Sequence, residues 1–164
     1  MTARESPATC PVRVEVNGSW RTGDVEPRRT LADFLREDLD LTGTHLACEH
    51  GFCGNCNVLF DGQTVRACLM LAVQADGHSV ETVEGLAERD GTLSALQQAF
   101  TEHHGLQCGF CTPAMLMTAV EFMRSHPEGG SDDEIREAIS GVICRCTGYQ
   151  QIVEAIQAAS GGSR

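Results

Sequence analysis

The spacing of its cysteines is the feature that most restricts what this chain can fold into. Nine cysteines occur in 164 residues, and an odd number cannot pair completely within one chain. In a reducing compartment, groups of cysteines are more often metal ligands than disulfides. Eight of the nine fall into two ordered groups: Cys48, Cys53, Cys56 and Cys68, then Cys108, Cys111, Cys144 and Cys146. We therefore interpret both groups as metal sites.

The first group has the spacing C-x4-C-x2-C, followed after eleven residues by Cys68. This is the plant-type [2Fe–2S] spacing, apart from a much shorter gap to the fourth cysteine. Gly51 and Gly54 lie inside the loop, and glycines there let backbone N–H groups turn inward toward sulfur. Four thiolates on two irons need a wrapping loop and one ligand from elsewhere. We expect Cys68, placed in a second β-hairpin, to supply it.

The second group joins a C-x2-C pair to a C-x-C pair across 32 residues. In the predicted helices, Cys108 and Cys111 come just before Pro113, and Cys144 and Cys146 come just before Thr147. A helix N-terminus carries partial positive charge, which stabilises an anionic thiolate cluster. Structural zinc, disulfides and buried inert thiols are the alternatives. Neither C-x4-C-x2-C nor a one-residue gap is typical of zinc ribbons.

Cys10 and His50 are two further residues that could bind a metal. Cys10 is isolated near the N-terminus, and we interpret it as a non-ligand. His50 lies between Cys48 and Cys53, where a histidine could be a ligand as in Rieske centres. Because eight cysteines are available, we favour a surface or hydrogen-bonding role for His50.

The N-terminal half has an α+β pattern. Alternating apolar residues predict a hairpin of strands 12–16 and 20–25 around Asn17-Gly18. A helix over 31–39 follows a candidate cap at Thr30, and 40–56 is predicted to be a loop. A second hairpin, 58–60 with 65–73, completes a small unit resembling a β-grasp.

The C-terminal half has a helical pattern. A linker is predicted at 88–91, and Gly105 is expected to close the first helix in a left-handed conformation. The second helix starts at Thr112-Pro113 and runs to about Ser125. A capping box at Ser131 starts the third, and the fourth follows Thr147. We predict two domains, 1–86 and 87–164, the second an all-α four-helix unit.

Charge and hydropathy exclude several functions. The net charge is −11 and lysine is absent, so a phosphate-binding loop and a nucleic-acid surface are both disfavoured. No apolar run approaches 18 residues, so no membrane span is expected. The segment Met1 to Pro11 lacks the apolar stretch of a secretory signal. Arg28-Arg29 faintly resembles a twin-arginine signal, but acidic residues follow it. We expect a cytoplasmic protein.

Five segments carry a resemblance that covers residues 11–158. They are CEHGFCGNC (48–56), DGQTVRAC (61–68), TVEG (82–85), QCGFCTP (107–113) and CRCTGY (144–149). Together they resemble the iron–sulfur subunit of the molybdenum hydroxylases, the xanthine dehydrogenase and aldehyde oxidase family. The likeness is to its split form, where the small subunit is similar to that of aerobic carbon monoxide dehydrogenase.

The resemblance implies a plant-type ferredoxin-like domain followed by a four-helix domain, each with one [2Fe–2S] cluster. It implies that Cys48, Cys53, Cys56 and Cys68 hold a cluster distal to molybdenum, and that Cys108, Cys111, Cys144 and Cys146 hold the proximal one. Gln107 and Cys146 would lie near the molybdopterin cytosine dinucleotide of a large subunit. A medium subunit would bind FAD, in a dimer of heterotrimers, and this chain would contribute no catalytic residue.

The sequence departs from the commonest family pattern at Ala47, Asn55, Asn57 and Val142-Ile143. We expect the first three to alter hydrogen bonding to sulfur and hence the distal potential. The implied function is an oxidoreductase subunit that relays electrons one at a time. A stand-alone ferredoxin-like carrier or redox sensor is the alternative. Carbon monoxide, an aldehyde, a purine and an N-heterocycle are equally open as substrates, as is the final acceptor.

Overall fold

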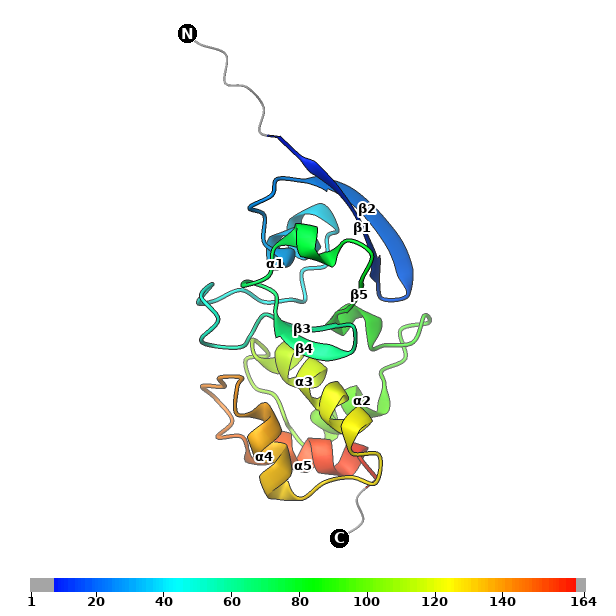
Figure 1. The fold of residues 1–164 in the computed structure, drawn as a ribbon. Coiled ribbons are helices and arrows are strands. Elements are labelled where there is room, and N and C mark those ends of the chain that lie inside the picture. Colours follow the sequence, from blue (N-terminus) through cyan, green and yellow to red (C-terminus); the bar gives the residue numbers. More distant parts are fainter. Residues whose placement is uncertain (1–7, 162–164) are drawn as a thin grey trace.

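A computed structural model describes residues 8–161 of the chain as a sheet-containing unit stacked on a helical unit (Figure 1). Residues 1–7, part of the segment expected to lack an export signal, lie outside the described residues. Within the described part of the chain, none of the helices is both long and apolar enough to cross a bilayer.

Five strands form one sheet in the order β2-β1-β5-β3-β4. Their bounds are β1 Cys10–Val16, β2 Ser19–Val25, β3 Asn57–Phe60, β4 Gln63–Arg66 and β5 Ser79–Glu81. Strand β5 pairs parallel to β1, and the other pairings are antiparallel. The predicted first hairpin is confirmed, with Asn17 and Gly18 at φ 51° and 73°. Two left-handed residues give a turn whose twist matches that of the strands.

The second hairpin is shorter than the predicted 58–60 and 65–73. Strand β4 ends at Arg66, because the Leu69 N–H donates to the Arg66 carbonyl and turns the chain. A 3₁₀ turn, η2 (Ala72–Ala75), replaces the predicted strand end. Cys68 therefore lies two residues beyond β4 rather than within the hairpin. Strand β5 was not predicted, because three residues are too few for an alternating pattern.

A short helical segment packs beneath the sheet. It begins as α1 (Leu31–Asp33) and continues as the π-helical turn η1 (Phe34–Asp38). The predicted cap is confirmed, since the Thr30 hydroxyl accepts a 3.1 Å bond from the Asp33 N–H. The second half is wider than the α-helix we predicted: the Leu39 N–H bonds to the Phe34 carbonyl, five residues back. Leu31 and Phe34 are completely buried.

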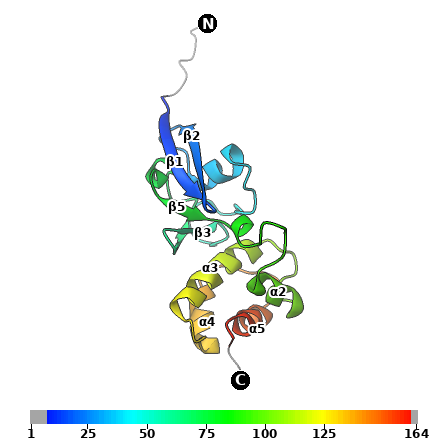
Figure 2. The same ribbon diagram turned by 90° about the vertical axis from the view of Figure 1, so that its right-hand side faces the viewer.

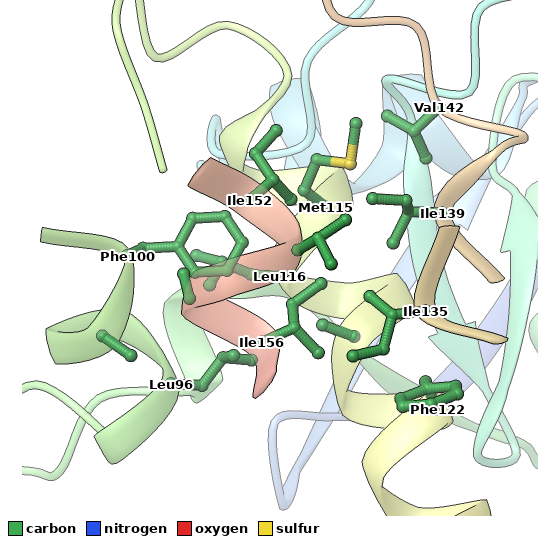
Figure 3. Close-up of a cluster of buried hydrophobic side chains, with 14 of the residues drawn as sticks. Leu96, Phe100, Met115, Leu116, Phe122, Ile135, Ile139, Val142, Ile152 and Ile156 are labelled. Atoms are coloured by element: carbon green, nitrogen blue, oxygen red, sulfur yellow. The ribbon is translucent and has the colours of Figure 1, made fainter. Parts of the chain in front are cut away.

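Four helices form the second unit, after the short 3₁₀ turn η3 (Val83–Gly85). They are α2 Ala95–Glu102, α3 Thr112–Ser125, α4 Asp132–Ile139 and α5 Gln150–Ala159. Helix α3 packs against β3 and β4, whereas α4 and α5 lie farther from the sheet (Figure 2). Figure 3 shows Phe100, Met115, Ile139 and Ile152 converging in the core that joins the four helices.

The helix ends differ in part from the predictions. The capping box at Ser131 is confirmed. Helix α2 ends with His104 in the left-handed conformation (φ 55°), not Gly105 as predicted. Gly105 instead lies under Phe100, where an added Cβ would be 3.2 Å from the ring. Helix α3 starts at Thr112 with Cys111 as its N-cap, and α5 starts at Gln150, three residues later than Thr147.

Candidate metal centres

The loop that carries the first cysteines is folded around the sulfur of Cys48. Glu49, Gly51 and Gly54 all have positive φ angles, of 55°, 79° and 74°. The turning loop aims the Cys53 N–H at the Cys48 sulfur, 3.3 Å away, as expected from the glycines. Backbone N–H groups, first that of Cys53, lower the pKa of Cys48 to about 6. The loop therefore favours a thiolate at this position.

Cys56 and Cys68 form the buried side of the same site. Cys56 ends the loop just before β3, and the Ala67 N–H donates to its carbonyl, which brings Cys68 alongside. Both side chains are buried. Burial raises the pKa of Cys56 to about 11, and the neighbouring Cys68 thiol contributes. Such thiols become thiolates when a metal ion supplies the compensating charge.

The helical unit gathers its four cysteines at the start of α3 and before α5. Cys111 is buried at the N-cap of α3, and burial, followed by the thiols of Cys144 and Cys108, raises its pKa to about 12. Cys146 is exposed, and hydrogen bonding to the Cys108 thiol raises its pKa. Cys111 and Cys144, 33 positions apart in sequence, are thus neighbours, as are Cys108 and Cys146, 38 positions apart.

Within each unit the cysteine thiols lie close enough to shift one another's pKa. Cys53 acts on Cys48, Cys68 and Cys53 act on Cys56, Cys144 and Cys108 act on Cys111, and Cys108 and Cys144 act on Cys146. Within residues 8–161, no three His, Cys, Asp or Glu side chains surround a point suited to one metal ion. Four thiols gathered in each unit fit a binuclear cluster, in which each iron takes two protein ligands. A tetrahedral zinc site instead needs four thiolates around one centre.

Thr147 and Tyr149 brace the loop that carries Cys144. The Cys144 N–H donates to the Tyr149 hydroxyl over 2.9 Å, and that hydroxyl donates to the Val142 carbonyl over 3.3 Å. The Thr147 N–H lies 3.5 Å from the Cys144 sulfur and its hydroxyl 3.1 Å. Burial alone would raise the pKa of Cys144, but the hydrogen bonds from Thr147 and other nearby groups lower it overall. The sequence placed Thr147 before the fourth helix and indicated no contact of either side chain with the Cys144 loop.

We expect Tyr149→Phe to alter the helical-unit centre while the chain still folds. The substitution keeps the ring but leaves the Cys144 N–H without its acceptor, at a cost of about 1–3 kcal/mol. Denaturant unfolding measures that loss, and the electron paramagnetic resonance of the reduced protein should change for one centre only. Thr101→Val is the matched control, because it removes a hydroxyl bonded within α2. Equal spectra for wild type and Tyr149→Phe would contradict a bracing role.

Three polar residues in or beside the first cysteine loop, His50, Asn55 and Asn57, have different surroundings. His50 is exposed, and its Nδ1–H donates to the Cys48 carbonyl. Asn55 is buried, and its Oδ1 has no hydrogen-bond partner among residues 8–161. Asn57 does not bond to sulfur as expected, because its Nδ2 donates to Thr118 over 2.9 Å and its Oδ1 accepts from Arg66. Sequence reasoning missed this link between the two units.

The two loops also touch directly. The Ile143 N–H donates to the Cys53 carbonyl over 2.8 Å. A Cβ added to Gly54 would be 2.2 Å from the Gly141 carbonyl oxygen, so glycine is required for this approach. We call the contact of Gly51–Gly54 and Arg66 with Gly141–Ile143 the junction. It connects the backbones of the two cysteine sites.

Both halves of the chain match known iron–sulfur families. Residues 14–87 match the 2Fe-2S iron-sulfur cluster binding domain, and residues 82–157 match the [2Fe-2S] binding domain. The chain is 58% identical to the caffeine dehydrogenase subunit gamma of Pseudomonas sp. (strain CBB1), over 91% of this chain and 90% of that protein. It is 56% identical to the nicotine 6-hydroxylase small subunit of Paenarthrobacter nicotinovorans, over 92% and 89%.

A solved structure shows the same arrangement of units. A chain of quinoline 2-oxidoreductase from Pseudomonas putida 86 superimposes with a TM-score of 0.90 and 50% identity, covering 94% of this chain and 95% of that one. The predicted fold class, a ferredoxin-like unit followed by a helical unit, is confirmed. Sequence and structure agree: the chain belongs to the family of iron–sulfur small subunits of the molybdenum hydroxylases.

Proposed function

We propose that this chain relays electrons, one at a time, from the molybdopterin site of a large subunit to the FAD of a medium subunit. When bound, a [2Fe–2S] cluster supplies a site that takes up and releases single electrons. Cys48, Cys53, Cys56 and Cys68 would hold the distal cluster, and Cys108, Cys111, Cys144 and Cys146 the proximal one. The gathering of four thiols in each unit, close enough to shift one another's pKa, is the observation that supports the assignment.

The surface around Cys146 suits the side toward molybdopterin cytosine dinucleotide. Gln107 and Cys146 are both exposed, on the two loops that carry the helical-unit cysteines. Leu106, Phe110 and Ile143 expose 39–41% of their surface on the same loops. Exposed apolar residues grouped in this way are typical of protein interfaces. We therefore assign Gln107 and Cys146 to contact with the cofactor of the large subunit.

A second exposed apolar pair lies beside the sheet-unit cysteines. Phe52 exposes 72% of its surface and Leu69 61%. Leu69 covers Gly51, where an added Cβ would be 2.4 Å from the leucine side chain. Phe52 comes directly before Cys53, and Leu69 directly after Cys68. We assign this surface to the medium, FAD-binding subunit.

The chain has two separate hydrophobic cores, which bear on its division into domains. We place the domain boundary between residues 86 and 87. One buried core lies within 12–80 and another within 96–156, and Val83 and Leu86, just before the boundary, pack against the second core. We propose a dimer of heterotrimers in the cytoplasm, where reduced thiols persist. All nine cysteines are free thiols in the structure.

Purification from the native cell tests the proposed partnership. The chain should co-purify with two larger chains, one containing molybdenum and one containing FAD, as shown by mass spectrometry and cofactor analysis. A monomer that carries its iron but no partner would favour the stand-alone carrier and contradict the proposal. If the three chains do co-purify, the substrate and the final electron acceptor can be identified with the purified complex.

A further inference from the structure

Arg66, the last residue of β4, joins the two cysteine loops. Its Nη2 donates to the Gly141 carbonyl over 2.7 Å, and its Nε donates to the Gly51 carbonyl over 3.4 Å. Its Nη1 donates to the Asn57 side-chain oxygen. The side chain is partly buried. Three acceptors from three separate segments hold its guanidinium.

Each of these segments adjoins a cysteine assigned as a ligand, and Asn57 directly follows Cys56. Gly51 comes two residues before Cys53, and Gly141 comes three residues before Cys144. Arg66 itself comes two residues before Cys68. The Ile143-to-Cys53 backbone bond runs alongside, and an added Cβ on Gly141 would be 2.8 Å from the Arg66 Nη2. A displacement of Arg66 would therefore be transmitted to ligands of both sites.

We propose that Arg66 is a positioning residue that sets the spacing and relative orientation of the two metal centres. This inference rests on the proposed ligand assignment. The planar guanidinium directs its donors along fixed directions, whereas a lysine ammonium is a single flexible point charge. Arg66 can thus fix Gly51 and Gly141 relative to each other in a way that lysine cannot. Its positive charge is also held by carbonyls of both cysteine loops, and a positive charge near a cluster favours the reduced form.

A second arginine provides the matched control. Arg124 donates two 2.7 Å hydrogen bonds to Glu81, so it too connects the helical unit with the sheet unit. It is in the last turn of α3, whereas Cys111 caps the first turn, about 20 Å away at 1.5 Å per residue. Substitution of Arg124 removes a link between the units without touching the junction.

The test uses the purified, iron-loaded complex with Arg66→Lys, Arg66→Met or Arg124→Met. Iron content, midpoint potentials and the magnetic interaction between the two reduced centres are measured by redox-poised electron paramagnetic resonance. Arg66→Met should lower both potentials and change the magnetic interaction. Arg66→Lys should retain the potentials and still change the interaction. Arg124→Met should leave all three quantities at wild-type values.

Unchanged magnetic interaction in both Arg66 variants would overturn the inference, and so would an equal change in Arg124→Met. If Arg66→Met does not fold, the lysine variant alone decides between these results, because it keeps the charge and most of the side-chain length. A wild-type complex with fewer than two [2Fe–2S] signals would instead contradict the proposed function.

Discussion

Cys146→Ser is expected to reduce the iron content from about four to about two atoms per chain, because each [2Fe–2S] cluster contains two. Cys146 is exposed, so serine adds no buried polar group and the helical unit should still fold. Its partner Cys108 would lose the thiol that completes one pair. The signal assigned to the ferredoxin-like unit should remain, while electron transfer from the large subunit should be lost. Iron analysis and electron paramagnetic resonance measure both effects.

Cys10→Ser is the control for this substitution. Cys10 lies at the start of β1, opposite Val25 and outside both cysteine groups. Its replacement should leave the iron content and both signals at wild-type values. Unchanged turnover in Cys146→Ser would contradict the ligand assignment, and loss of a signal in Cys10→Ser would show that the ninth cysteine had been misassigned.

Gly54→Ala is expected to destabilise the junction more than any other single methyl substitution at a turn glycine. Gly54 has φ 74°, which costs an L-residue about 1–2 kcal/mol. Its new Cβ would also be 2.2 Å from the Gly141 carbonyl oxygen, a backbone atom that cannot rotate away. Overpacking of this kind adds about 1–3 kcal/mol. Denaturant unfolding of the holoprotein, followed at the visible absorbance of the clusters, measures the total.

Gly62→Ala separates the two contributions to that loss. Gly62 has φ 83°, but no atom of the described part of the chain lies within 4 Å of its added Cβ. The substitution should therefore cost only the left-handed backbone conformation. The excess destabilisation of Gly54→Ala over Gly62→Ala measures the clash at the junction. Equal losses in the two variants would show that the close approach of Gly54 to Gly141 does not contribute.

Local patterns predicted much of the fold because they act over a few residues. The Asn17-Gly18 turn and the capping box at Ser131 each need only neighbouring residues, and both are confirmed. The left-handed residue of α2 was misplaced because His104, a non-glycine, adopts that conformation while Gly105 accommodates Phe100. Here tertiary packing decides which residue closes the helix.

The contacts between the two units could not be predicted in the same way. Arg66 and Gly141 are 75 residues apart, and Asn57 and Thr118 are 61 apart. Contacts between such distant residues leave no periodic pattern in the sequence. The cysteine groups were found because metal ligation restricts both residue type and spacing. The partners of Tyr149 were not, because the CRCTGY string does not show where the phenol points.

A redox titration of the wild-type complex, with iron and zinc analysis of the same sample, tests the central claim most directly. Two cluster-binding sites in two units require about four irons per chain and two distinct [2Fe–2S] signals that appear as the potential is lowered. Negligible zinc should accompany them in this chain. A single signal, about two irons per chain, or stoichiometric zinc in either cysteine group would contradict the claim.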